Sequence, residues 1–297
     1  MNDIAKEIVL TVLYFDIFNY PLTEAEIMER LKIQDITSVE INNEIEKLVH
    51  DKIFYQKNNF FSVREMNGIE DRKIRNIRAE KYIYISKKMA KFLGRFPYVR
   101  AIAISGSTSK GNAYKGADVD YIILTEKGRI WLVRAVLILY RLFITRFLKK
   151  SEKFSCFNHF ITSEYTFSDK NIYVAYEIVA SIPVYNENVI ENFIERHKWI
   201  NEYFPNYPNK MLNEVIINKS GKLKRFLEFL LNNFFGNLIE LTIRKLTRYR
   251  QKRTIKKLSL SSEEIKKMSK VTNDRIMYRA RKNDQLKILE IYQKKDL

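Results

Sequence analysis

Residues 101–128 read AIAISGSTSKGNAYKGADVDYIILTEKG, and this stretch decides the fold class. A short apolar run ends in Gly106-Ser107, a loop of small and polar residues follows, and a second apolar run begins around Asp118 and Asp120. Residues i and i+2 of a strand point to the same face of a sheet, so we expect the two carboxylates to lie on one face. Neighbouring carboxylates repel each other, which predicts a cation between them.

The residue types of this stretch suit a phosphate ligand and a metal ion. Mg²⁺ prefers oxygen ligands and is usually held by one or two carboxylates together with the phosphates of a substrate. Gly106 allows a tight turn whose amides can approach a phosphate. The Ser107 hydroxyl can donate a hydrogen bond to it, and Lys110 adds positive charge nearby.

The arrangement resembles the signature of the polymerase-beta-type nucleotidyltransferase superfamily: a strand, a Gly-Ser turn, ten intervening residues and an Asp-x-Asp on the next strand. The resemblance covers residues 99–185, and the wider layout resembles uncharacterised bacterial nucleotidyltransferase-domain proteins. It implies an enzyme that transfers a nucleoside monophosphate from an NTP to an acceptor hydroxyl with Mg²⁺ or Mn²⁺. The acceptor is a small molecule, a protein or an RNA end. The implied catalytic metal ligands are Asp118 and Asp120, and the implied nucleotide-binding residues are Gly106, Ser107 and Lys110.

One feature of the superfamily is missing from the sequence. Its members usually carry a third carboxylate on a following strand, and the matching segment, FSCFNHFIT at 154–162, holds no acid. Asn158 or His159 occupies the corresponding place, and Glu164 and Glu177 are the nearest downstream acids. Asparagine cannot act as a general base, whereas histidine can accept a proton near neutral pH. The alternative is a catalytically weak or inactive regulator that keeps the fold and binds nucleotide or nucleic acid.

Residues 1–64 are predicted to form a winged-helix-like unit. Three helical patterns precede a hairpin around Asn58-Asn59, and Thr23 with Glu26 forms a capping-box pattern at the start of the second helix. Residues 1–65 contain 7 Lys/Arg and 12 Asp/Glu, which disfavours DNA binding and favours a structural or protein-contact role. The inner side of the third helix is expected to consist of Val39, Ile41, Ile45 and Leu48.

The remaining chain completes an α+β prediction. Residues 65–98 are expected to form a helical connector, and 99–185 a mixed-sheet nucleotidyltransferase domain in which Pro183 ends the last helix. Residues 186–297 are expected to form a basic helical region throughout. The predicted architecture is therefore a winged-helix unit, a central mixed sheet and a C-terminal helical region.

Positive charge is concentrated near the C-terminus. The chain has 297 residues and a net charge of +18, and residues 219–297 contain 22 Lys/Arg and 8 Asp/Glu. The segments 243–257 and 270–284 place basic residues among aromatic ones. This pattern suits nucleic-acid phosphates and bases, an anionic membrane surface, or a solvated helix face.

Two apolar stretches are not expected to cross a membrane, because charged residues interrupt them. Segment 130–150 contains three arginines and is predicted to form a long, mostly buried helix, with a membrane-surface helix as the alternative. Segment 226–243 contains Glu228 and Glu240 and is predicted to form a core helix. With Cys156 as the single cysteine and acids in the N-terminal segment, we expect a cytoplasmic protein without disulfides.

Overall fold

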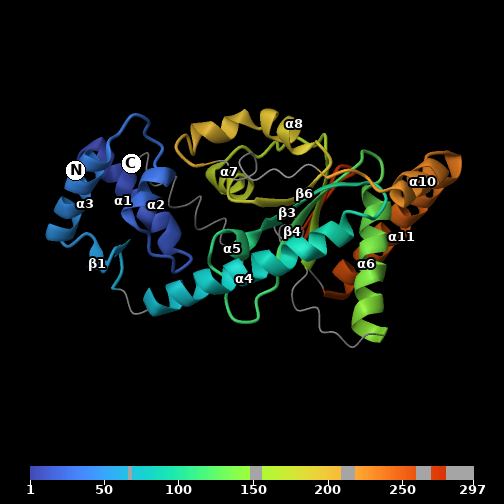
Figure 1. The fold of residues 1–297 in the computed structure, drawn as a ribbon, viewed down its shortest axis with the longest axis horizontal. Coiled ribbons are helices and arrows are strands. Elements are labelled where there is room, and N and C mark those ends of the chain that lie inside the picture. The colour runs from blue at the N-terminus through green and yellow to red at the C-terminus, as the bar shows by residue number, and fades with distance from the viewer. Residues whose placement is uncertain (66–68, 148–155, 209–217, 259–268, 279–297) are drawn as a thin grey trace.

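The structure, a computed structural model, describes residues 1–65, 69–147, 156–208, 218–258 and 269–278. These residues form an α+β protein with a mixed sheet at its centre (Figure 1). The N-terminal helices lie at one end of the long axis, and α10 (Lys222–Leu231) lies at the other (Figure 1). The α+β class expected from the sequence is confirmed.

Three helices and a hairpin open the chain. At the starts of the second and third helices, Thr23 and Thr37 each form a capping box with a glutamate three residues on, the first as predicted. The hairpin turns at Asn58-Asn59, where Asn58 has a φ of +54°. These elements are α1 (Asp3–Asp16), α2 (Glu24–Arg30), α3 (Ser38–His50), β1 (Tyr55–Lys57) and β2 (Phe60–Ser62).

The inner side of α3 is narrower than predicted. Ile41, Ile45 and Leu48 are buried, whereas Val39 is 67% exposed. Position 39 lies about 200° around the helix from position 41, so it points to solvent while the others point inward.

The connector predicted over 65–98 contains one described helix, α4 (Ile69–Leu93), which runs from the N-terminal elements along the sheet (Figure 1). The described strands of the sheet have the order β6-β3-β4-β5-β8-β7, and among them only β4 and β5 are parallel. The parallel pair is joined through α6 (Ile130–Phe147). The strands are β3 (Val99–Ser105), β4 (Asp120–Thr125), β5 (Cys156–Thr162), β6 (Ile182–Asn186), β7 (Ser269–Val271) and β8 (Arg275–Tyr278).

The two faces of the sheet are buried in two different apolar clusters. Ala103 and Ile122 belong to a cluster that also includes residues of the N-terminal helices and of α7. Ile104 and Ile123 belong to a second cluster, with residues of α4 and α6. Alternate residues of each strand therefore enter opposite clusters, as the period of a strand requires. The helices on the first face are α7 (Ile172–Val179), α8 (Ile190–Glu195) and the 3₁₀ helix η1 (Lys198–Glu202).

Two segments predicted to be helical contain strands. Pro183 was expected to end a helix but lies in β6, an edge strand, where one side of the backbone needs no partner in the sheet. The strands β7 and β8 lie within 186–297, where helices alone were predicted. They form a tight hairpin whose turn is closed by hydrogen bonds between Thr272 and Arg275, and they extend the sheet beyond β5.

Two apolar segments are more exposed than predicted. The first half of α6 is mostly buried, but Leu139 and Phe143 in its second half are exposed. Segment 226–243 is not one core helix: it contains the end of α10 and the start of α11 (Phe234–Leu258), and many of its apolar side chains face solvent. Among the helices described, none is long and apolar enough to cross a bilayer.

Candidate active site

The turn after β3 lies directly against the first residue of β4. β3 and β4 pair antiparallel with Ser105 opposite Asp120, so the strand that ends at the turn and the strand that begins with the acid share one end of the sheet. Gly106 follows with a φ of +68°, in the left-handed region. A Cβ at this position would lie 2.5 Å from Oδ2 of Asp120. Any other residue at this position would therefore force the Asp120 carboxylate to move and would strain the backbone.

The two aspartates differ in their surroundings. Asp120 is half-buried, and its neighbours Val119 and Tyr121 are both buried in the cluster formed with α4 and α6. Asp120 therefore points to the opposite face, the one covered by α7. Asp118 is exposed and precedes the strand, so the prediction that both acids belong to one strand is wrong for Asp118.

The loop between the turn and β4 is held by two other parts of the chain. Nδ2 of Asn112 donates a hydrogen bond of 3.2 Å to the carbonyl oxygen of Phe18, which follows α1. From α4, Nη1 of Arg78 donates to the carbonyl of Ala113 at 2.9 Å. Arg75 also donates to Asn112, at 3.3 Å. The N-terminal elements and α4 therefore fix the loop that directly follows the candidate phosphate-binding residues.

Two residues considered from the sequence form an ion pair with each other. Nζ of Lys110, at the end of the short helix α5 (Gly106–Ser109), contacts the carboxylate of Glu177 on α7. The same ammonium lies 5.0 Å from the ring centroid of Tyr176. Glu177 thus approaches the turn from the face to which Asp120 points, with its charge neutralised by Lys110.

The other candidates for a third ligand lie in or after β5. Backbone register places His159 opposite Ile122, so the half-buried His159 side chain faces the same side of the sheet as Asp120. The Asn158 side chain lies outside the part of the chain that the structure describes. Glu164 is exposed and pairs with Lys127 at 2.8 Å, beyond the far ends of β4 and β5. That ion pair lowers the pKa of Glu164 and places it away from Asp120.

The donor set suits Mg²⁺ or Mn²⁺ better than a metal that needs several protein ligands. Within the described ranges, no three or more His, Cys, Asp or Glu side chains gather in a way that could hold a metal ion. Asp118 and Asp120 offer two carboxylates two residues apart at the start of β4, opposite the Gly106 turn. Mg²⁺ completes such a set with water and phosphate oxygens, whereas zinc takes three or four protein ligands.

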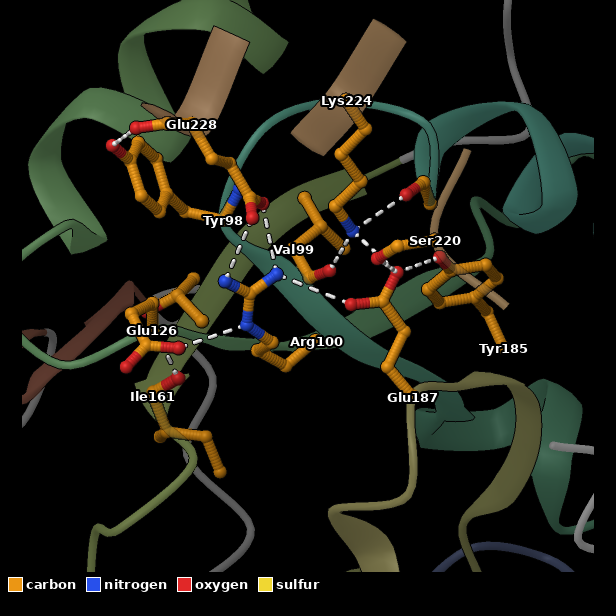
Figure 2. Close-up of polar contacts among 12 residues, drawn as sticks. Tyr98, Val99, Arg100, Glu126, Ile161, Tyr185, Glu187, Ser220, Lys224 and Glu228 are labelled. Carbon is orange, nitrogen blue, oxygen red and sulfur yellow. Dashed lines mark hydrogen bonds and ion pairs between the residues drawn. The ribbon is translucent and has the colours of Figure 1, made fainter. Parts of the chain in front are cut away.

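A charge network that the sequence analysis missed lies at the opposite end of β3 (Figure 2). Arg100 donates to Glu126 at 2.8 Å, to Glu187 at 3.1 Å and to Glu228 at 2.8 Å. Lys224 is buried and donates to Glu187 at 2.7 Å and to two backbone carbonyls. Burial lowers the pKa of Lys224, and the hydrogen bonds to Glu187 lower the pKa of that carboxyl despite its own burial.

This network is structural, because each of its charges has a partner of opposite sign within hydrogen-bond distance. It attaches α10 to β3 and β6. The sequence carried a signal for it: Lys224 and Glu228 are four residues apart in α10, on one side of a helix whose other side is apolar.

The candidate site thus combines a glycine turn, an adjacent carboxylate and a lysine–glutamate pair on one face of the sheet. No family model matches the sequence, and no curated protein or solved structure matches it either.

Proposed function

We propose that the protein is a metal-dependent nucleotidyltransferase of the polymerase-beta type. It would transfer a nucleoside monophosphate from an NTP to an acceptor hydroxyl. The observation that carries the proposal is the contact of Gly106 with Asp120 at the shared end of two antiparallel strands. A turn without a side chain, pressed against a carboxylate, can bring backbone amides and a metal ligand to one triphosphate.

Each residue of the site has a separate role in this proposal. Asp118 and Asp120 hold Mg²⁺ or Mn²⁺ together with phosphate oxygens. The bound ion supplies positive charge where negative charge builds up on the transferred group. The Gly106 backbone and the Ser107 hydroxyl bind the terminal phosphates. The acceptor oxygen forms a bond to the α-phosphorus, the bond from that phosphorus to the bridging oxygen breaks, and Lys110 neutralises the leaving pyrophosphate.

Lys110 has to exchange partners when an NTP binds. Its ammonium contacts the Glu177 carboxylate in the free protein, and triphosphate oxygens compete for the same donor. The exchange frees the Glu177 carboxylate on the Asp120 face, where a third acid is otherwise missing from the described residues. Glu177 and His159 are then the two candidates to accept the proton of the acceptor hydroxyl.

We further propose that residues 1–64 are a winged-helix unit, that 65–98 connect it to a nucleotidyltransferase domain at 99–185, and that 186–297 form a third, mainly helical part. The hairpin β1–β2 and the bridge between Leu22 and Phe61 support the first assignment. The acidic α3 argues for a structural role rather than for DNA binding. The N-terminal unit contributes to the site through the carbonyl oxygen of Phe18, which accepts a hydrogen bond from Asn112.

Label transfer from an α-labelled NTP, with Mg²⁺ or Mn²⁺ and a cell extract as the acceptor source, tests the activity. We expect transfer by the wild type and at least a hundredfold loss in Asp120→Asn, because the metal ligand is then neutral. The matched control is Glu164→Gln, which removes an acid outside the site and should leave transfer unchanged. Equal transfer by wild type and a folded Asp120→Asn would exclude the proposed mechanism.

A second candidate function is nucleotide binding without transfer. It is favoured by one observation, the pairing of Glu177 with Lys110, which leaves no third acid beside Asp120 among the residues described. In that case metal-dependent NTP binding persists, but no label is transferred to any acceptor and no pyrophosphate is released.

A further inference from the structure

Exposed apolar side chains gather on the outer sides of α10 and of the start of α11. Phe229 is 78% exposed, Phe234 74% and Phe235 70%, although these are among the most apolar side chains. Exposed leucines and a fourth phenylalanine adjoin them on the same two helices. We call this surface the α10–α11 apolar face; its members are Phe226, Phe229, Leu230, Phe234, Phe235 and Leu238.

The helices that carry this face are anchored from the inner side. In α10, Lys224 and Glu228 enter the charge network of Arg100 (Figure 2). In α11, the carboxylate of Glu240 accepts hydrogen bonds from the backbone of Trp131 and Leu132 at 3.0 and 2.7 Å. The inner sides are therefore used by polar contacts, and rotating either helix to bury its phenylalanines would break them.

The same anchoring removes negative charge from the outer surface. Glu228 and Glu240 are the only acids between residues 222 and 258, and both point inward. The exposed charged residues around and beyond the apolar face are all basic among the described side chains, and its other exposed polar residues, such as Asn233 and Asn237, are neutral. On α10 and α11 the exposed basic side chains include Lys222, Arg225, Lys245, Arg250, Lys252 and Arg253.

We propose that the α10–α11 apolar face docks on an anionic lipid bilayer, with both helices lying in the plane of the interface. Phenylalanine and leucine side chains would enter the boundary between headgroups and acyl chains, and the basic residues would contact anionic headgroups. Exposed apolar side chains match the acyl-chain boundary of an anionic bilayer, and exposed cationic side chains match its headgroups. The two acids of these helices point inward and do not oppose this contact. This inference does not depend on the proposed nucleotidyl transfer.

Other occupants fit the face less well. A second copy of the chain would bring two cationic surfaces together, which like-charge repulsion opposes. A single-stranded nucleic acid would use the basic and aromatic residues. It would leave exposed aliphatic side chains such as Leu223, Leu230 and Leu238, which have no ring for a base to stack on, without a role.

Docking of this kind would keep the candidate active site away from the membrane, because α10 is anchored at the end of β3 opposite to the Gly106 turn. α10 lies at the end of the molecule opposite to the N-terminal helices, with the sheet between them (Figure 1). The bilayer would thus hold one end of the protein and leave the N-terminal elements in the aqueous phase.

Vesicle co-sedimentation of the full chain tests the proposal. We expect binding to vesicles of phosphatidylcholine with 30% phosphatidylglycerol, at least tenfold weaker binding to phosphatidylcholine alone, and weakening by added salt. Phe229→Ser/Phe235→Ser should reduce binding at least tenfold, and Lys252→Glu/Arg253→Glu should remove the preference for anionic lipid. The matched control is Ile77→Ser on α4, a 67%-exposed residue outside the face, which should bind as the wild type does.

Three outcomes would overturn the proposal. One is a folded wild type that binds neither vesicle. Another is equal binding by the wild type and Phe229→Ser/Phe235→Ser. The third is that Phe229→Ser/Phe235→Ser leaves vesicle binding unchanged but abolishes a dimer in sedimentation or weakens binding to a polyuridine probe. That result would assign the face to a second copy of the chain or to a nucleic acid.

Discussion

At the scale of single residues, the proposed nucleotide site depends on Gly106. Replacement by alanine would place a Cβ 2.5 Å from the Asp120 carboxylate and force that side chain to move. We expect Gly106→Ala to lose metal-dependent NTP binding at least tenfold. Gly116→Ala is the matched control, because Gly116 also has a positive φ but nothing lies within 4 Å of its Cβ position.

Both alanine variants pay a backbone cost of about 1 kcal/mol in the left-handed region, so both should be slightly less stable in thermal unfolding. Only Gly106→Ala should change NTP affinity in calorimetric titration. Equal affinities of the two variants for NTP would mean that the contact between Gly106 and Asp120 has no role in binding.

Substitutions of Lys110 and Glu177 are expected to have opposite effects on NTP binding. Lys110→Met should weaken NTP binding, because the ammonium that meets the phosphates is lost. Glu177→Gln removes the carboxylate that competes for Lys110, so NTP binding should be retained or tightened a few-fold. Label transfer by Glu177→Gln should nevertheless fall at least tenfold if Glu177 acts as the third acid, and unchanged transfer would assign that role elsewhere.

At the scale of secondary-structure elements, Glu240 links α11 to the start of α6. Its carboxylate accepts from two backbone amides in the first turn of α6, which otherwise have no helical partner. Glu240→Ala should reduce the free energy of unfolding by about 1–3 kcal/mol, measured by urea denaturation. Glu46→Ala, at an exposed position of α3, is the control and should cost much less.

The stabilisation from Glu240 should depend on pH. Burial raises its pKa above the ordinary value of 4.5, and the two backbone hydrogen bonds only partly oppose this. The folded state therefore keeps a proton at pH values where the unfolded chain has lost it. The difference in unfolding free energy between the wild type and Glu240→Ala should shrink as the pH rises from 4.5 through the folded pKa. A difference that grows over this range would contradict the assignment.

Local patterns in the sequence predicted many helices and strands, but they did not predict which helix faces are buried by other elements. The capping box at Thr23, the hairpin at Asn58-Asn59 and the strands flanking the Gly-Ser turn depend on neighbouring residues, and sequence alone sufficed. Pro183 was misassigned because a proline in an edge strand and one that ends a helix look alike locally. Segment 226–243 was wrongly assigned to the core because its apolar content was taken as a sign of burial. Composition alone does not show whether another element covers a helix.

The site was predicted only in part for a similar reason. The Gly-Ser turn and the two aspartates are close in sequence, so their spacing was informative. The approach of Glu177 to Lys110 joins α7 to the turn across 67 residues, and no local pattern predicts such a contact. The network of Arg100 also draws on three distant segments and was missed, although the four-residue spacing of Lys224 and Glu228 carried a signal for its helical part.

At the scale of the whole molecule, the N-terminal helices and the sheet share one apolar core. Phe15 of α1 packs edge-to-face on Tyr176 of α7 at 5.1 Å, in the cluster that also contains Trp199. Phe15→Ala should therefore lower the urea midpoint reported by Trp199 fluorescence, with a loss of about 3–5 kcal/mol. The measurement uses a Trp131→Phe background, because Trp131 is the second of the two tryptophans and belongs to the other cluster. A urea midpoint from Trp199 fluorescence that does not change in Phe15→Ala would mean that the N-terminal unit folds independently.

The most direct test of the central claim is calorimetric titration of each NTP into the protein, with Mg²⁺ and then with EDTA. We expect one or more NTPs to bind with Mg²⁺, and binding to weaken at least tenfold with EDTA and in Asp118→Ala/Asp120→Ala. This result would establish that the turn and the aspartates form one metal-dependent nucleotide site. No binding of any NTP by a folded wild type, or equal binding by the double variant, would contradict the account.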